Sequence, residues 1–443
     1  MPKFIFHNNN EKLPAHDKNT FPVQIYDTHK WNVHKSSSIG NGILNSIRNL
    51  GCPVSTESFD FLTISLAVTA ADTFFKRELS DNSWARIFDL DIPLANPEKW
   101  IESKITLERA LGFLTGDQWN LNFQSGGLNP PKPKKSKLAK KKAQSLRKLN
   151  CACLFSGGLD SAVGAIDLVN GNGPHRPILI SHAYKGDASK QKMVAQVLKQ
   201  NMYGTAAFNA NPHIISQLKG KTDITMRSRS FNFLAMATMG LSAVQYMNSS
   251  QDNLIFVPEN GFISLNPPLT PRRIGSLSTR TTHPYFISLI QEVLDSVGIN
   301  AIIVNRYQTK TKGQMLRECL DKKALSTAIP STVSCSNWHR KRIQCGRCLP
   351  CIIRRSAIYH GGYASDASYQ TLDLSRITSE SSRDDLFALI AAISKINGGV
   401  DIAGWVRLSG PLPSDQIIRA DLIKVFPDGL KEVENFLKSV SAI

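Results

Sequence analysis

From about residue 150 onward, short apolar runs alternate with longer segments of helical periodicity. The short runs end in polar, glycine or proline residues, which is typical of buried strands. Strands that alternate with helices form a parallel sheet covered by helices on both faces, because each crossover returns over one face. The pattern therefore predicts an α/β fold for this part of the chain. Strands are expected in ACLFS (152–156), RPILISHAY (176–184), NLIFVPEN (253–260) and AIIVNRY (301–307), and helices at 160–170, 187–202, 230–247 and 283–297.

The N-terminal region has a different pattern. Helical periodicity at 58–79 and 97–116 is interrupted by an alternating, strand-like segment at 84–94, and a short strand is expected at 118–124. These residues contain no catalytic motif. We therefore expect residues 1–128 to form an α+β accessory domain.

Composition changes mark the remaining boundaries. Glycine, proline and lysine predict a basic linker at 129–149, before the α/β domain at 150–365. Two helical segments, at 384–396 and 429–440, predict a C-terminal helical region at 366–443. No internal repeat is detectable in the sequence.

Charge is concentrated in one segment. The chain has 443 residues and a net charge of +18, and residues 131–148 contain eight lysines, one arginine and no acidic residue. A run of this kind forms either a solvated linker or a surface that binds nucleic acid or another polyanion. Both interpretations remain open at this stage.

The sequence predicts a cytoplasmic protein. Residues 8–10 are asparagines, where a signal peptide would have its apolar segment. The longest nearly apolar stretch, at 231–247, contains Asn232 and Ser242 and predicts a buried helix rather than a membrane span. In the cytoplasm, clustered cysteines favour a metal site over disulfides.

The first predicted strand leads into the loop SGGLDS at 156–161, directly before a predicted helix. Glycines let backbone N–H groups approach an anion, and the positive end of the helix dipole follows. Ser156 and Ser161 add hydroxyl donors, so the loop predicts a phosphate site. No lysine ends the loop, which excludes the Walker pattern. The alternative is a glycine-rich turn in which Asp160 caps the helix.

Four cysteines late in the chain have the spacing Cys335-x9-Cys345-x2-Cys348-x2-Cys351. Four thiolates at such spacing can form a tetrahedral Zn²⁺ site that stabilises a loop with little core of its own. An iron–sulfur cluster and reduced, unliganded thiols are the alternatives. His339 lies inside the loop, but four sulfurs already complete the site.

Together these motifs resemble a known family. SGGLDS resembles the PP-loop of ATP pyrophosphatases, which cleave ATP between the α- and β-phosphates, adenylate a substrate oxygen and let a nucleophile displace AMP. With the later four-cysteine spacing, residues 150–360 are similar to the 7-cyano-7-deazaguanine synthase (QueC) family. The resemblance implies a Rossmann-like PP-loop domain that uses ATP, Mg²⁺ and Zn²⁺.

The resemblance also implies roles for individual residues. Arg229 matches a basic residue that opens a buried helix, and Lys310 and Lys312 match a late lysine motif. With Asp160, placed near Mg²⁺ or at the helix cap, these are the expected catalytic residues. The expected ATP-binding residues are Ser156, Gly157, Gly158, Leu159, Asp160, Ser161, Ser181 and His182.

Substrate binding would need different groups. A deazaguanine edge presents N–H donors, for which the Glu259 carboxylate is a suitable acceptor, and Asn260 would bind another edge. Arg272 and Arg273 would hold a carboxylate or phosphates, or else form ordinary surface ion pairs.

The sequence also departs from the family. The family's Asp-Cys-Arg-Pro substrate loop is replaced by NPPLTPRRIGSLSTRTTHPYF at 266–286, and the N-terminal region is additional. This long form looks like the QueC-like proteins of bacterial antiphage systems, in particular of the Qat type. The resemblance therefore implies adenylation of a 7-deazaguanine carboxylate and transfer to an amine, expected on a partner protein from the same defence operon.

Three other functions remain as alternatives. The first is nitrile synthesis, as in 7-cyano-7-deazaguanine synthase itself. The second is tRNA modification by a PP-loop enzyme, which the basic run favours. The third is nucleotide binding without catalysis, against which the intact SGGLDS loop argues.

Overall fold

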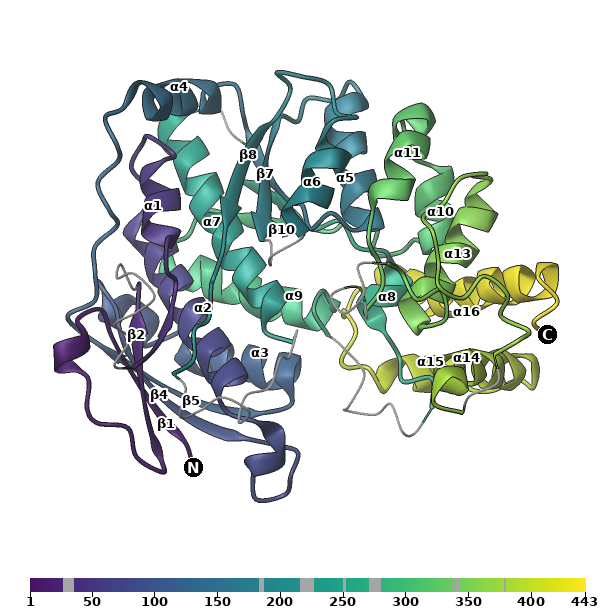
Figure 1. Ribbon diagram of the computed structural model, residues 1–443, viewed down its shortest axis with the longest axis horizontal. Coiled ribbons are helices and arrows are strands. Elements are labelled where there is room, and N and C mark those ends of the chain that lie inside the picture. Colours follow the sequence, from purple (N-terminus) through teal and green to yellow (C-terminus); the bar gives the residue numbers. More distant parts are fainter. Residues whose placement is uncertain are drawn as a thin grey trace.

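The computed structural model contains two five-stranded parallel sheets and a group of C-terminal helices beside them (Figure 1). The structure describes residues 1–26, 36–182, 187–215, 227–249, 252–270, 280–336, 338, 343–377 and 380–443. The α/β class expected from the sequence is confirmed. Among the helices in these ranges, none has both the length and the apolar composition that crossing a bilayer requires.

The first sheet belongs to the N-terminal region and has the strand order β3-β2-β1-β4-β5. Helix α2 lies between β3 and β4 in the chain, and helix α3 lies between β4 and β5. Such helical crossovers let successive strands run parallel to one another. The strands are β1 (Lys3–His7), β2 (Thr20–Ile25), β3 (Ser37–Ile39), β4 (Ile87–Pro93) and β5 (Gln118–Gln124). The helices are α1 (Ile43–Arg48), α2 (Thr56–Phe74) and α3 (Lys104–Thr115), with 3-10 turns at Asn10–Lys12, Arg77–Leu79 and Pro97–Trp100.

The α+β class expected for the N-terminal region is wrong. Every strand pair described in the first sheet is parallel, so this region is α/β like the rest. The sequence pattern predicted only its last two strands. The first three strands lie within residues 3–39, where no element was predicted, although β1 (KFIFH) alternates between buried and half-buried positions as a strand does.

The second sheet has the order β10-β9-β6-β7-β8 and is also parallel. Four of its strands overlap the predicted segments. The fifth, β8, lies in GTAAF, whose glycine and alanines give no clear strand signal. The strands are β6 (Cys151–Leu154), β7 (Pro177–His182), β8 (Gly204–Phe208), β9 (Leu254–Phe256) and β10 (Ile302–Val304). The helices are α5 (Leu159–Asn170), α6 (Asp187–Ala195), α7 (Arg229–Met247), α8 (Gly261–Leu265) and α9 (Pro284–Val297).

The two sheets have the same topology. Numbered along the chain within each sheet, both have the order 3-2-1-4-5, which is the Rossmann order. Equivalent elements also meet. An isolated antiparallel bridge joins Ser38 of the edge strand β3 to His213, five residues after the end of the edge strand β8, and α2 contacts α7 as α3 contacts α9. The chain thus contains two sheets of the same strand order whose equivalent helices contact each other, which the sequence does not reveal.

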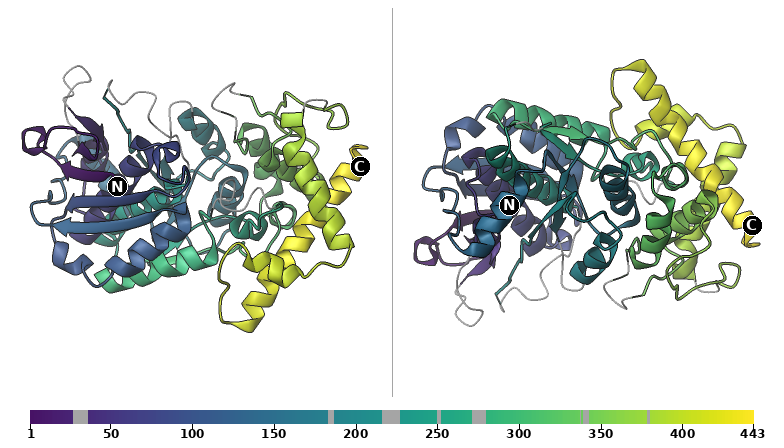
Figure 2. Two further views of the ribbon diagram at one scale, coloured as in Figure 1. Left: turned by 90° about the horizontal axis from the view of Figure 1, so that it is seen from below. Right: turned by 90° about the horizontal axis from the view of Figure 1, so that it is seen from above.

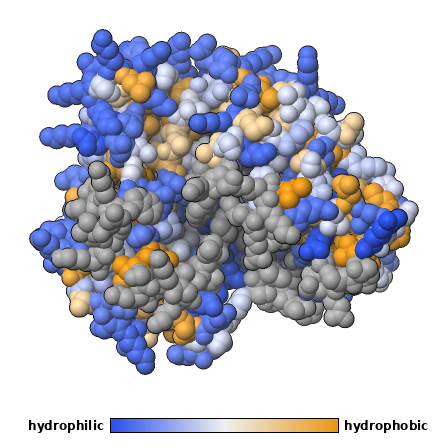
Figure 3. Space-filling model, in the orientation of Figure 1, coloured by the Kyte–Doolittle hydropathy of each residue, from blue (hydrophilic) through white to orange (hydrophobic). Residues whose placement is uncertain are grey.

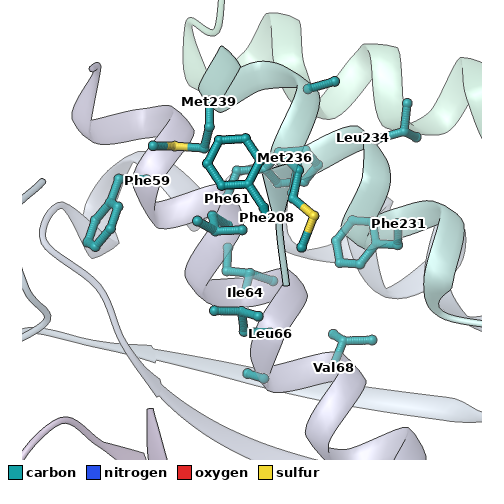
Figure 4. Packing of buried hydrophobic residues seen from close by; sticks show 14 of the residues in the cluster. Phe59, Phe61, Ile64, Leu66, Val68, Phe208, Phe231, Leu234, Met236 and Met239 are labelled. Atoms are coloured by element: carbon teal, nitrogen blue, oxygen red, sulfur yellow. The ribbon is translucent and has the colours of Figure 1, made fainter. Parts of the chain in front are cut away.

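Helices α2 and α7 lie between the two sheets and bury nearly all of their surface (Figures 1 and 4). Phe61 of α2 meets Phe231 of α7 edge to face, with ring centroids 5.3 Å apart. Met236 and Met239 fill the space beside Phe208 of β8 (Figure 4). Burying one such aromatic side chain contributes roughly 1.5–3 kcal/mol. Residues from both sheets therefore form one continuous core.

The basic segment before the second sheet is folded. Its helix α4 (Lys137–Leu146) begins at Ser136, whose Oγ accepts a hydrogen bond from the N–H of Ala139. One face of α4 is apolar and packs on α7, while most of the lysines face solvent. Hydrophilic residues cover this corner of the molecule (Figure 3).

The C-terminal helices form a separate cluster at the opposite end from the first sheet (Figure 2). The segments expected to be helical at 384–396 and 429–440 lie inside α14 and at the end of α16. The helices of this cluster are α13 (Leu349–Gly361), α14 (Glu380–Asn397), α15 (Ile402–Arg407) and α16 (Gln416–Ser439). Before them, α10 (Lys312–Arg317), α11 (Lys322–Ala328) and the 3-10 turn at Ile329–Ser331 pack with α5 on the core of the second sheet.

Candidate functional site

A cavity of about 420 Å³ opens beyond the carboxyl ends of β6 and β9. These neighbouring strands are the switch point of the second sheet, where the chain order reverses and open α/β sheets bind their ligands. Apolar side chains such as Phe233, Val257 and Ile263 form one wall. The polar lining comes from six segments of the sequence, and it includes Ser156, Gly158, Asp160, Ser161, Arg229, Glu259, Thr281, Thr282, Lys312 and Ser334.

The SGGLDS loop forms the floor of the cavity. Gly157 has φ +81°, a left-handed conformation that glycine adopts without strain. The N–H of Gly158 donates to Ser156 Oγ over 3.2 Å, and Ser161 Oγ donates to the carbonyl of Gly158 over 3.0 Å. Gly158 is the N-cap of α5 and has no side chain to accept from the first turn. This arrangement suits an anion at the start of α5, and the phosphate site stays a prediction. We call residues 156–161 the phosphate loop after that prediction.

Asp160 is the centre of a buried polar cluster. Its Oδ1 accepts from Lys312 Nζ over 2.5 Å, and its Oδ2 accepts from Asn260 Nδ2 over 2.6 Å. Burial alone would raise its pKa, but the Lys312 charge and the hydrogen bonds lower the pKa of Asp160 to about 2. Asp160 is therefore ionised, and its charge is balanced by Lys312.

Glu259 lies against the same carboxylate. Burial and the neighbouring charge of Asp160 hold the pKa of Glu259 well above its ordinary value. The protonated carboxyl of Glu259 is hydrogen-bonded to Asp160. In this state Glu259 is a neutral acid, whereas the sequence argument had treated it as a carboxylate acceptor. Asn260 is the N-cap of α8 and holds Asp160, so its amide is already engaged.

Arg229 enters the cavity from the first residue of α7. Its Nη2 donates to the carbonyl of His182 over 3.3 Å, and its guanidinium lies over the Phe233 ring. The His182 ring is buried, which lowers its pKa to about 3 and keeps it neutral. Ser181 Oγ donates to the carbonyl of Phe155. His182 is therefore linked to the site through its backbone carbonyl, which Arg229 contacts. Neither the Ser181 nor the His182 side chain is in the described lining of the cavity.

The two predicted lysines are placed differently. Lys312 lies in the cavity, whereas Lys310 Nζ is half exposed and bonds Glu318 Oε2 over 2.5 Å. Leu159 lines the cavity and is buried in the core below it. Arg272 and Arg273 lie outside the described residues.

The four cysteines come together in a second cluster. Their sulfur atoms lie within 4.8 Å of one another, and all four side chains are buried. Cys345 Sγ lies 3.9 Å from Cys351 Sγ, and Cys348 Sγ lies 4.0 Å from Cys335 Sγ. Tetrahedral zinc with Zn–S bonds of about 2.3 Å requires sulfurs about 3.8 Å apart. The cluster therefore fits a metal such as Zn²⁺.

The cysteine cluster is joined to the phosphate loop. The N–H of Val333, two residues before Cys335, donates to the carbonyl of Gly157 over 3.1 Å. A second cavity of about 300 Å³ lies between the two loops, beside Lys190, Arg229 and Trp338. A metal in the cluster would hold the wall of the phosphate site in place.

No family model, curated protein or solved structure matches this chain.

Sequence reasoning missed two contributors to this site. Lys190 lies beside the phosphate loop and over the Trp338 ring, 5.5 Å from its centroid, but it belongs to no motif. Glu432 reaches the Lys312 segment from α16. Neither residue has a local sequence signal, because each is brought to the site only by packing.

Proposed function

We propose that this protein is an ATP-dependent enzyme that adenylates a 7-deazaguanine carboxylate, or a similar acid, and transfers the acyl group to an amine. The observation that supports this most directly is the convergence of the SGGLDS loop, Arg229 and Lys312 on one cavity. The loop resembles the PP-loop of ATP pyrophosphatases, which perform this activation. The proposed setting is antiphage defence, with a partner protein as the amine donor.

The proposed reaction has two steps. A carboxylate oxygen of the substrate attacks the α-phosphorus of ATP, and the bond to the β-phosphate oxygen breaks, releasing pyrophosphate. An amine then attacks the acyl carbon, loses a proton and displaces AMP, leaving an amide. A carboxylate is a poor electrophile, and the adenylate supplies the leaving group that it lacks.

The described residues suit these roles. The N–H groups at the start of α5, with Ser156 and Ser161, would hold phosphate oxygens. Arg229 and Lys312 would stabilise the charge that develops on the α-phosphate. Asp160, as the ionised carboxylate, is the residue that would hold Mg²⁺, which neutralises phosphate charge when bound. The apolar wall with Phe233 would receive a planar ring.

The first experiment measures pyrophosphate and AMP formed from ATP, Mg²⁺ and 7-carboxy-7-deazaguanine. We expect both products with the wild-type chain, and a loss of at least 100-fold in Lys312→Ala. Lys310→Ala is the matched control and should retain most of the activity, because Lys310 faces Glu318 on the surface. Product formation no faster than in the absence of acid, or equal losses in both variants, would contradict the proposal.

The second experiment identifies the acceptor. Co-expression with the proteins encoded beside this chain, followed by intact-mass spectrometry, should show a mass increase on one partner equal to the acyl group. Nitrile or amide formed from ammonia, with no modified partner, would favour nitrile synthesis instead. The tRNA-modifying alternative, which the exposed lysines of α4 favour, is tested by incubating the same enzyme with ATP and tRNA and measuring nucleoside modification.

A further inference from the structure

Glu432, from the C-terminal helix α16, contacts the segment that contains Lys312. Its Oε1 accepts a short hydrogen bond from Thr311 Oγ1, and its Oε2 accepts from the N–H of Gly313 over 3.0 Å. Thr311 and Gly313 are the two neighbours of Lys312 in the chain. The Glu432 side chain is almost fully buried, with 9% of its surface exposed. One carboxylate therefore fixes the backbone on both sides of the lysine.

These bonds complete the start of helix α10. Thr311 is its N-cap: Thr311 Oγ1 accepts from the N–H of Gln314 over 3.0 Å, and the Gln314 side chain accepts from the N–H of Thr311. The N–H of Gly313 belongs to the first turn and has no partner within the helix, because its carbonyl partner would lie before the start. Glu432 supplies the missing acceptor.

The fit at Gly313 is tight. A Cβ at this position would lie 2.5 Å from Glu432 Oε1 and 2.6 Å from Oε2. Glycine is therefore required for the carboxylate to reach the backbone. This gives a way to displace Glu432 without changing its charge.

The held segment delivers Lys312 to the phosphate loop. Lys312 is 8% exposed, and its Nζ bonds Asp160 Oδ1 over 2.5 Å. Other groups face Glu432 from neighbouring helices: His360 Nε2 of α13 lies 3.5 Å from Glu432 Oε1, and Arg317 Nη1 of α10 lies 3.2 Å from His360 Nε2. Helices α10, α13 and α16 thus meet at this carboxylate.

We propose that Glu432 is a positioning residue that orients Lys312 toward Asp160 and the phosphate loop by holding Thr311 and Gly313. The C-terminal region is then part of the active-site framework. The expected effect on the reaction rate rests on the proposed function. The placement of Lys312 can be tested without turnover.

The test compares Glu432→Ala, Glu432→Gln and Gly313→Ala with Glu434→Ala as the matched control. Glu434 lies two residues further along α16. Its carboxylate accepts hydrogen bonds from Lys431 and Lys438 of the same helix rather than from the Lys312 segment. The first readout is acylation of lysine amines by a small N-hydroxysuccinimide ester in the unliganded protein, followed by peptide mass spectrometry. Lys310, which is half exposed, serves as the internal reference.

We expect Glu432→Ala and Gly313→Ala to increase labelling of Lys312 relative to Lys310 at least fivefold, while Glu434→Ala leaves the ratio unchanged. Glu432→Gln keeps the acceptor for Thr311 and should give an intermediate ratio. Variants are compared only after thermal unfolding and metal analysis show that each of them is folded. If Glu432→Ala does not fold, Glu432→Gln and Gly313→Ala still test the proposal. An unchanged Lys312 ratio in folded variants would overturn the proposal.

The second readout is pyrophosphate formation. Misplacing a catalytic group by about 1 Å costs on the order of 100-fold in rate. We expect kcat to fall by about 10- to 100-fold in Glu432→Ala and Gly313→Ala, with a smaller change in the KM for ATP, because the phosphate loop is intact. A loss confined to KM would contradict positioning of Lys312. If the wild-type chain forms no pyrophosphate, the proposed function fails, and the labelling ratio alone still decides the role of Glu432.

Discussion

At the scale of single residues, the candidate site separates groups that look equivalent in the sequence. Lys310 and Lys312 belong to one motif, but only Lys312 reaches the cavity. Asp160 and Glu259 are both buried acids, but the Lys312 charge keeps Asp160 ionised, whereas burial beside Asp160 keeps Glu259 protonated. Two carboxyl groups in one site with opposite protonation states are typical of functional clefts.

The Glu259 carboxyl predicts a pH dependence of stability. Its pKa is raised in the folded chain but close to its ordinary value of 4.5 in the unfolded chain. Above pH 4.5 the unfolded state therefore binds fewer protons than the folded state, and stability falls as the pH rises. Glu259→Gln removes this proton difference. We expect the free energy of unfolding to decline less between pH 5 and 8 in Glu259→Gln than in the wild type, as measured by denaturant titration.

The control for this effect is Glu434→Gln. Hydrogen bonds from Lys431 and Lys438 lower the pKa of Glu434 to about 2, so its titration lies below the tested range. Between pH 5 and 8, the free energy of unfolding of Glu434→Gln should change with pH as steeply as that of the wild type. Identical slopes for Glu259→Gln and the wild type would mean that Glu259 is ionised in the folded chain.

At the scale of elements, the loop from Val333 to Cys351 depends on its four cysteines. Before α13, its described residues show only a helical residue at 338 and an isolated bridge from Gln344 to Tyr369, and its buried side chains are mainly the cysteines themselves. Such a loop lacks the apolar core that would hold it without metal. Its contact with Gly157 links metal binding to the phosphate loop.

Metal removal should therefore act on the phosphate site. We expect one equivalent of zinc in the purified chain by elemental analysis, without the visible absorbance of an iron–sulfur cluster. Cys348→Ser should lose the metal, become sensitive to proteolysis between 333 and 348, and lose at least 10-fold in pyrophosphate formation. Cys52→Ser, a buried cysteine of the N-terminal region, is the control and should keep the metal. Full activity without metal would contradict the coupling.

Helix α4 gives a second prediction at this scale. It is held on the molecule by Ala139, Ala143 and Leu146, so its exposed lysines form a fixed surface rather than a flexible linker. We expect the variant Lys137→Gln, Lys140→Gln, Lys141→Gln to bind tRNA about 10-fold more weakly at 50 mM salt, with a reduced salt dependence, because phosphate contacts release counterions.

The control for α4 removes the same charge elsewhere, at Lys322, Lys323 and Lys424, which are exposed. Binding is measured by filter retention over a range of salt concentrations. Equal affinities for the two triple variants would leave α4 as a solvated helix.

At the scale of the whole molecule, the N-terminal sheet is joined to the site as well as to the core. The carbonyls at the end of α3 accept from two arginines of the second half: Thr115 from Arg227 Nη1 over 2.6 Å, and Phe113 from Arg280 Nη1 over 3.1 Å. Positive charge at a helix C-terminus is favourable. Arg227 stands two residues before Arg229, and Arg280 directly precedes the cavity residues Thr281 and Thr282.

The shared core predicts that the second half does not fold by itself. A chain of residues 129–443 would expose the face of α7 that packs on α2, including Phe231 and Leu234 (Figure 4). We expect this fragment to be insoluble or to bind a hydrophobic dye, and the intact chain to unfold both sheets in one calorimetric transition. Soluble, cooperative folding of 129–443 would show that residues 1–128 are an independent domain.

Much of the second sheet was predictable, because its strands and helices have the local periodicities of a buried parallel sheet. In the first sheet only β4 and β5 were predicted, and its parallel class was missed, because parallel pairing between distant strands leaves no local signal. The same division holds in the site. Ser156–Ser161 were singled out by residue type and motif and the four cysteines by their spacing, whereas Lys190 and Glu432 were not, because packing alone brings them there.

The sequence by itself predicted the four-thiol cluster and the α/β class, and it indicated the SGGLDS loop as a candidate anion site. These follow from residue types at fixed spacing, which the chain sets locally. The tertiary structure decided which lysine faces Asp160, which acid keeps its proton, and how a carboxylate from α16 holds the Lys312 segment. Those properties depend on burial and on contacts between residues 99 to 152 positions apart, and only the folded chain brings them together.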